Sequence, residues 1–217
     1  MLSGDPLLLQ IIGVTLRMSL TSSLVALLLG VPLGVFLSVG KSRFKTTLIV
    51  LNRTMMGLPP VVCGLLCYLM FCGVGPLRWA HLLYTVEGML IAQVILITPI
   101  IAGNLEAFAR GIVEPVRETC TGRRIGAGKR LLLRVGECRY QVCSTYLLGL
   151  GRAMAEVGAV SMVGGAIAYK TNVMTTAIMM YTNRGDFKLA IALGIILILI
   201  FLVLNIVTHV LQSRISK

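Results

Sequence analysis

Apolar residues gather into five stretches along the chain, at about 16–39, 55–71, 88–102, 142–163 and 189–210. Several of them reach the about 17 to 25 residues that a helix needs to cross a lipid bilayer. Shorter polar segments separate them, and no alternating strand pattern stands out between them. The pattern therefore predicts an all-α membrane protein, a five-span helical bundle that forms one domain over residues 1–217.

A weaker helical pattern precedes the first stretch. Leu8, Leu9, Ile12 and Leu16 recur at the spacing of one helix face after an Asp-Pro start, which is typical of a helix with one wet and one apolar side. We expect this segment to lie along the outer membrane interface, ahead of the first span.

Glycine and proline mark special points within the spans. Gly30 and Gly34 are four residues apart, a spacing that lets another backbone approach closely, and packing within the chain is the favoured interpretation. Proline frees backbone carbonyls, which a lipid-facing helix cannot leave unsatisfied. Pro59-Pro60 and Thr98-Pro99 therefore predict kinked spans around a pathway, although kinks also occur in simple bundles.

Composition and charge exclude a soluble protein and set an orientation. The chain is 57% apolar and 13% charged, against roughly 25% charged in soluble domains. The net charge of +12 is compatible with nucleic-acid binding, but 14 of the 20 Lys and Arg fall in 41–53, 110–139 and 214–217, beside the apolar stretches. This is the positive-inside pattern. It predicts an outer N-terminus, an inner C-terminus and no nucleic-acid partner.

The basic segment at 104–140, between the third and fourth spans, is long for a simple connection. Its first part carries an apolar stripe and the pair Glu106 and Arg110, one helical turn apart. Glu114-Pro115 predicts a new helix start, and Gly122 a helix end. Attraction to lipid headgroups would explain the positive charge of this segment but not its other features. A protein partner explains the glycines and interleaved acidic residues as well, and it is favoured.

Few charged residues fall inside the spans. Arg152 and Glu156 are one helical turn apart and are interpreted as a structural pair, with a role in a path or gate as the alternative. Arg17 is predicted to reach the outer interface, and attraction of an anion at the mouth is the alternative. Hydroxyl groups at 171, 175 and 176 suit either an oxyanion or the cap of a short outer helix, and capping is favoured.

The remaining reactive side chains point to no metal site or disulfide framework. The six cysteines are scattered without zinc spacing and are read as small packing residues. His81 and His209 are isolated near predicted span ends. The N-terminal residues lack a basic n-region, so no cleaved signal peptide is expected.

Several motifs, in order, resemble the permease subunits of ATP-binding-cassette (ABC) importers, and within them the tungstate and molybdate branch. They are Gly30-Val31-Pro32-Leu33-Gly34, Gly57-Leu58-Pro59-Pro60-Val61, Gly151-Arg152-Ala153-Met154-Ala155-Glu156-Val157-Gly158, Met174-Thr175-Thr176-Ala177-Ile178 and Gly185-Asp186-Phe187. The resemblance implies import of an oxyanion across the cytoplasmic membrane. It also implies a second permease copy, a cytoplasmic ATPase dimer and an extracytoplasmic anion-binding protein as partners.

The same resemblance places an ATPase-coupling helix in the basic segment, with Cys120-Thr121-Gly122 where the family has Glu-Ala-Ala. The coupling residues so assigned are Cys120, Thr121, Gly122, Arg123, Arg124, Ile125, Gly126, Ala127, Gly128, Lys129 and Arg130. Arg17, Pro59, Pro60, Arg152 and Glu156 are assigned to the path or gate.

No phosphate-binding Gly-x4-Gly-Lys-Ser/Thr loop is present in the sequence. We therefore expect a transport subunit without enzymatic activity of its own and without a cofactor, with ATP and Mg bound by the partner. A secondary carrier or channel that works without an ATPase is the alternative. An intramembrane enzyme is disfavoured because no serine or cysteine has a histidine nearby in the predicted topology, and a subunit that only recruits another protein stays open.

Overall fold

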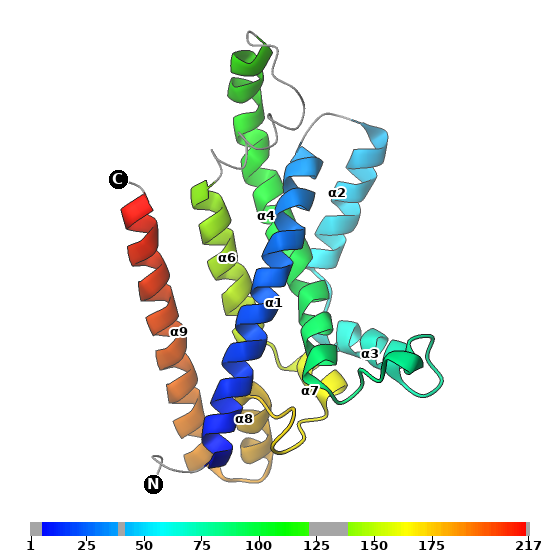
Figure 1. The fold of residues 1–217 in the computed structure, drawn as a ribbon, viewed down its shortest axis with the longest axis vertical. Coiled ribbons are helices and arrows are strands. Elements are labelled where there is room, and N and C mark those ends of the chain that lie inside the picture. The colour runs from blue at the N-terminus through cyan, green and yellow to red at the C-terminus, as the bar shows by residue number, and fades with distance from the viewer. Residues whose placement is uncertain (1–5, 39–41, 122–138, 216–217) are drawn as a thin grey trace.

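The computed structural model describes residues 6–38, 42–121 and 139–215, and all regular structure in these ranges is helical (Figure 1). The elements in chain order are α1 (Pro6–Ser38), α2 (Arg43–Met56), α3 (Pro60–Phe71), the short 3-10 helix η1 (Arg78–Ala80), α4 (Val86–Thr121), α6 (Arg139–Met154), α7 (Gly158–Gly164), α8 (Met174–Asn183) and α9 (Phe187–Ile215). The all-α prediction is confirmed. The first turn of α1 and the last turn of α9 lie at opposite ends of the bundle (Figure 1).

Three helices have the length and apolarity to cross a bilayer: α1, the part of α4 at Val86–Arg110, and the part of α9 at Phe187–Val207. Two bent helix pairs, α2 with α3 and α6 with α7, bring the number to five if each pair is one span. These assignments rest on length and composition. Most apolar side chains of α9 are exposed, as expected for a helix that faces lipid.

α1 is one continuous helix, so the prediction of a separate interfacial helix before residue 16 is wrong. Leu8 and Ile11 are buried in a cluster with Met174, Ala177 and Leu193. The Thr15 hydroxyl donates to the Ile11 carbonyl and accepts from the Met174 N–H. These contacts hold the first turns of α1 against α8 and α9, and the 33 residues span about 50 Å.

The second predicted span begins earlier than its apolar residues indicated. α2 starts at Arg43 and includes the basic residues that were assigned to a loop. Taken together, the residues of α2 are not apolar. Ile49 and Asn52 are nevertheless buried, and the Asn52 side chain donates to the Pro99 carbonyl of α4. Tertiary contacts therefore stabilise a helix that hydropathy alone does not reveal.

α4 continues well beyond the third apolar stretch, to Thr121. No helix begins at Glu114-Pro115, so that prediction is wrong, because proline at that point continues the existing helix. The eleven residues after Arg110 add about 16 Å to its length. Residues 122–138, which hold most of the predicted coupling segment, lie outside the described residues.

A close contact joins α1 to α4 through glycine. A Cβ atom at Gly30 would lie 2.7 Å from Cγ2 of Ile101, and one at Gly34 would lie 2.6 Å from the Ala102 carbonyl oxygen. Real Cβ atoms do not approach so closely. The prediction that these glycines serve packing within the chain is confirmed.

Candidate functional site

The bent pair of α2 and α3 breaks where proline interrupts the backbone hydrogen bonds, and α6 and α7 form a second bent pair. α2 ends at Gly57, Pro59 precedes α3, and Pro60 is the first helical residue of α3, a position that proline favours. The bend between α2 and α3 is 100°, and that between α6 and α7 is 54°. The predicted kink at Pro59-Pro60 is confirmed.

The elements that follow the two breaks, α3 and α7, contact each other. A Cβ atom at Gly158, the first residue of α7, would lie 2.9 Å from Cγ2 and 3.2 Å from N of Val61 in α3. A Cβ atom at Gly64 would lie 2.7 Å from the Cα of Ala159. The starts of α3 and α7 therefore pack backbone against backbone, and glycine is required on both sides.

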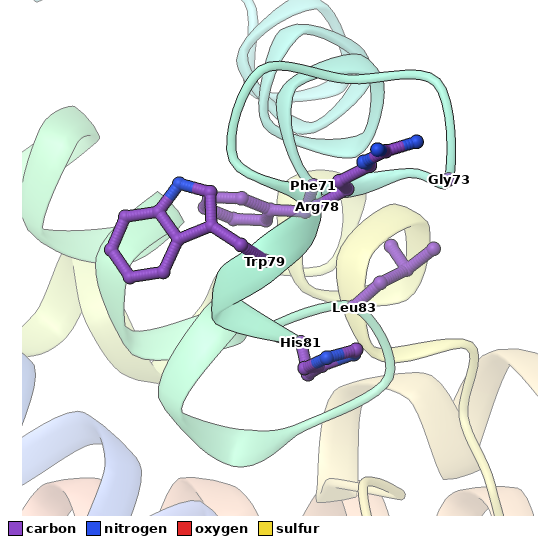
Figure 2. Close-up of a pocket in the computed structure, with 6 residues that line it drawn as sticks. All are labelled: Phe71, Gly73, Arg78, Trp79, His81 and Leu83. Carbon is purple, nitrogen blue, oxygen red and sulfur yellow. The ribbon is translucent and has the colours of Figure 1, made fainter.

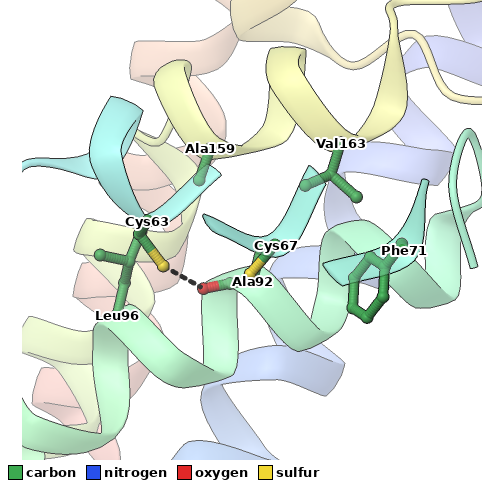
Figure 3. Packing of buried hydrophobic residues seen from close by; sticks show 7 residues of the cluster. All are labelled: Cys63, Cys67, Phe71, Ala92, Leu96, Ala159 and Val163. Atoms are coloured by element: carbon green, nitrogen blue, oxygen red, sulfur yellow. Dashed lines mark hydrogen bonds between the residues drawn. The ribbon is translucent and has the colours of Figure 1, made fainter. Parts of the chain in front are cut away.

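Small side chains continue this contact onto α4 (Figure 3). One buried cluster joins three helices. Its members are Cys63, Cys67 and Phe71 of α3, Ala92 and Leu96 of α4, and Ala159 and Val163 of α7. The Cys63 thiol donates to the Ala92 carbonyl over 3.8 Å. Cys63 and Cys67 are free thiols that fill space, which confirms the packing role predicted for them.

The charged pair predicted in the fourth span lies at the break between α6 and α7. Nη2 of Arg152 is 3.3 Å from Oε2 of Glu156, and the carboxylate is almost fully buried. Oε1 of Glu156 accepts from the Ala159 N–H at 3.1 Å, so the carboxylate also caps the start of α7. The structural pairing is confirmed, whereas the role in a path or gate stays a prediction.

Three threonine hydroxyls stabilise the backbone around this break. Thr176 accepts from the Val173 N–H at the start of α8. Thr171 accepts from the Ile167 N–H and donates to the Gly164 carbonyl. Thr175 donates to the Glu156 carbonyl over 2.9 Å. Thr176 therefore caps α8, as predicted, and Thr171 holds the loop between α7 and α8, whereas Thr175 bonds α8 to the backbone of the α6–α7 break.

A buried amide that the sequence analysis did not single out joins three helices. Gln93 of α4 is fully buried. Its Nε2 donates to the Ala153 carbonyl of α6, and its Oε1 accepts from the Ser22 hydroxyl of α1 at 2.7 Å. The sequence did contain a signal for this link: a glutamine within an apolar stretch indicates hydrogen-bond partners inside the protein, because burying the amide without partners would be costly.

A second buried polar group lies where α2 meets α4. Glu106 is buried, and its carboxylate contacts Arg110 one turn later and Arg53 of α2, the latter over 3.6 Å. The pair with Arg110 was predicted from the spacing. Arg53 was missed because it comes from another helix. The carboxylate therefore joins α2 to α4 near the basic end of the bundle.

A groove of about 640 Å³ runs between α4, α6 and α9. Its polar lining residues are Asn104, Gln141, Ser144, Thr145, Arg152 and Asn205. The groove thus brings the Arg152 guanidinium together with hydroxyl and amide groups from three helices. Sequence spacing gave no sign of it, because the three helices are far apart along the chain.

A smaller hollow of about 460 Å³ lies beside η1, in the connection between α3 and α4 (Figure 2). Phe71, Arg78, Trp79 and His81 line it. Trp79 is 73% exposed. Among the residues that the structure describes, no group of three or more His, Cys, Asp or Glu side chains is placed to hold a metal ion.

The remaining predicted site residues are separate from this region. Arg17 is exposed on α1. Cys120 and Thr121 are the last residues of α4. Gly122, Arg123, Arg124, Ile125, Gly126, Ala127, Gly128, Lys129 and Arg130 lie outside the described ranges. The ATPase-coupling assignment therefore stays a prediction.

Comparison with known proteins gives full-length relatives. The chain is 33% identical over 216 residues to the tungstate uptake system permease protein TupB of Peptoclostridium acidaminophilum, covering 99% of this chain and 94% of that protein. It is 33% identical to TupB of Campylobacter jejuni, over 78% of this chain and 71% of the relative. A probable anion ABC transporter permease of Haloferax volcanii is also 33% identical, over 91% of this chain and 88% of the relative. No family model matches the chain.

The fold has a solved counterpart. A chain from the crystal structure of a bacterial ABC transporter involved in the import of the acidic polysaccharide alginate matches with a TM-score of 0.79, covering 100% of this chain and 82% of the other, at 16% identity. That likeness concerns the fold. With the full-length relatives, it shows that this is an integral membrane transport subunit and not an enzyme: the chain belongs to the ABC transporter permease family that includes the tungstate uptake permeases.

Proposed function

We propose that the chain is the membrane subunit of an importer that moves an oxyanion inward across the cytoplasmic membrane, with tungstate as the first candidate cargo and molybdate as the second. The observation that carries the proposal is the 33% identity to TupB along 99% of the chain. A probable molybdenum ABC transporter permease of Haloferax volcanii is a more distant relative, at 27% identity over 65% of the chain.

ATP energy enters through a partner in this proposal. A cytoplasmic ATPase dimer docks on the segment from Cys120 to Arg130 and binds ATP and Mg, while a second permease copy and an extracytoplasmic anion-binding protein complete the importer. The reach of α4 supports this arrangement. The helix carries its last residues about 16 Å beyond Arg110, so it can transmit a displacement of the docked segment to the spans as a rigid rod.

The test of cargo and energy source is an uptake assay. Cells without their own tungstate uptake are given the chain together with its candidate ATPase and anion-binding protein, and cell-associated tungsten is measured by mass spectrometry. We expect uptake that needs all three proteins and that excess molybdate inhibits. Uptake that persists without the ATPase would instead support a secondary carrier or channel.

The coupling segment is tested by co-purification with the ATPase. Replacing Arg123, Arg124, Lys129 and Arg130 by Glu is expected to abolish the complex, because like charges then oppose the docking surface. Arg184→Glu with Lys188→Glu is the control, since both residues are exposed, Arg184 directly after α8 and Lys188 in the first turn of α9. An intact complex in the fourfold variant would refute the coupling assignment.

A further inference from the structure

The polar groove between α4, α6 and α9 holds more hydrogen-bonding groups than a lipid-facing surface tolerates. Arg152 lines it, and a charged side chain at mid-membrane costs at least about 2.5–3.5 kcal/mol unless it is paired or hydrated. Two asparagines, Asn104 of α4 and Asn205 of α9, face the same space. Such a lining suits water or a polar ligand better than lipid tails.

The charge that the groove presents is positive. Among the described lining residues Arg152 is charged and no carboxylate is present. Glu156 neutralises part of that charge, but its side chain is 3% exposed and is held by the Ala159 N–H, whereas the Arg152 side chain is 38% exposed. The anionic half of the pair is thus turned into the protein, and the cationic half faces the groove.

The Arg152 guanidinium has donors to spare. It carries five N–H groups in a planar fork, and its contact with Glu156 runs through Nη2 over 3.3 Å. Charge-assisted hydrogen bonds are usually about 2.7–2.9 Å, so this contact is loose. The structure gives the guanidinium no other hydrogen bond or ion pair within the described residues.

An unsatisfied hydroxyl supports the presence of a ligand in the same groove. Thr145 is 2% exposed and lines the groove. Its Oγ1 has no hydrogen-bond partner among the described residues. Each asparagine amide donates one N–H to the carbonyl four residues earlier, which leaves a second N–H on each Nδ2. A buried hydroxyl without a partner costs free energy until something binds it.

The Phe201 ring lies between the groove and a neighbouring apolar pocket, since it lines both. A Cβ atom at Gly151 would lie 2.8 Å from Cζ of Phe201, so the Phe201 ring packs directly against the Gly151 backbone. Beyond this contact lies an apolar pocket of about 200 Å³ lined by Met154, Ala155, Leu197 and Ile198. A hydrated anion that reached Arg152 would have to displace the ring to go further.

We propose that this groove is a binding site for a tetrahedral oxyanion within the transport path, where the anion binds the N–H groups of Arg152 that Glu156 does not use and takes donors from Thr145 and the two asparagines. The identity of the anion rests on the proposed function.

Thiol labelling tests the site without requiring transport. In a full-length chain with its native cysteines replaced, Ser144→Cys places a thiol in the groove, and Ile206→Cys places one on the exposed apolar side of α9 as a control. The probes are the anionic sulfonatoethyl and the cationic trimethylammonioethyl methanethiosulfonates, applied to membrane vesicles of both orientations. Rates are normalised to those of a free thiol.

We expect the groove thiol to react and to prefer the anionic probe about tenfold, the lower end of the enhancement that a cleft of one charge provides. Sodium tungstate should slow that reaction. The double variant Arg152→Gln/Glu156→Gln removes the charge without leaving a buried carboxylate unpaired, and it should abolish both the preference and the protection. Arg152→Lys should retain the preference.

A groove thiol as unreactive as the Ile206→Cys control would overturn the site, since lipid or a second copy would then fill the groove. A charge preference unchanged in the double variant would overturn the role of Arg152. These outcomes are separate from the uptake assay: failed tungstate uptake with this labelling pattern contradicts the proposed cargo and leaves the anion site supported.

Discussion

At the scale of single residues, several polar groups inside the bundle are bonded to another element of the chain. Gln93 joins α1 to α6, Thr15 joins α1 to α8, and Thr175 joins α8 to the break before α7. Each such hydrogen bond takes the place of one to water, which the membrane interior does not supply. The positions of these bonds, more than the apolar contacts, define which helix faces meet.

A double-mutant cycle on Gln93 and Ser22 measures one of these links. Gln93→Leu should lower the stability of the purified protein in lipid nanodiscs, because the Ser22 hydroxyl and the Ala153 carbonyl both lose a partner. Together with Ser22→Ala, we expect non-additivity of about 0.5–3 kcal/mol, measured by thermal unfolding. Strict additivity would mean that the hydrogen bond contributes nothing.

Gly34 provides a second test at this scale. Gly34→Ala should destabilise the protein by about 1–3 kcal/mol, the usual cost of overpacking, because its new Cβ would meet backbone atoms of Ala102 that cannot move aside. Gly13 lies in the same helix with nothing within 4 Å of its Cβ position. Gly13→Ala is therefore the matched control, expected to be neutral or stabilising. Equal losses in both variants would contradict the close contact.

At the scale of elements, charge joins α2 to α4 where hydropathy would not have paired them. The buried Glu106 carboxylate bonds two arginines whose side chains are 62% and 48% exposed. The loss of stability on removing one member of such a group depends strongly on which member is removed. The loss of both cations leaves an uncompensated buried carboxylate, whereas loss of the carboxylate leaves two cations that water can hydrate.

We therefore expect Arg53→Ala/Arg110→Ala to cost about 3–5 kcal/mol of stability and Glu106→Gln to cost less, although Glu106 is the buried residue. Arg53→Ala alone should cost little, because its contact is long and its side chain is exposed. The measurement is thermal unfolding of the three variants in one lipid. The opposite ranking would show that the carboxylate is not held by these cations.

At the scale of the whole molecule, the first turn of α1 and the last turn of α9 lie at opposite ends of the bundle (Figure 1), the arrangement that an odd number of crossings produces. The basic stretches then predict which end is inside. A fluorescent protein fused after Lys217 should fluoresce, and a cysteine at Ser3 should react with an impermeant thiol reagent added to intact cells. If Ser3→Cys reacted only in inverted vesicles, the predicted orientation would be wrong.

Much of the fold could be predicted because membrane helices follow local rules. Apolar stretches long enough to span lipid, basic residues beside them, Pro59-Pro60 at a kink, and charged pairs four residues apart are all properties of short segments. The same locality explains the errors. The first turns of α1 were separated from the first span although they are apolar, and α2 is not apolar enough on average to be recognised as part of a span. Contacts with α8 and α9 hold the former, and contacts with α4 hold α2.

The sequence by itself determined that this chain is an all-α membrane protein and that a helix bends at Pro59-Pro60, because transfer free energies and backbone geometry act within each segment. Only the tertiary structure decided that α3 and α7 meet at Gly158, that Gln93 joins three helices and that Arg152 shares a groove with Asn104 and Asn205. Such contacts join residues far apart in the chain, and each depends on how the helices pack, which no single segment specifies.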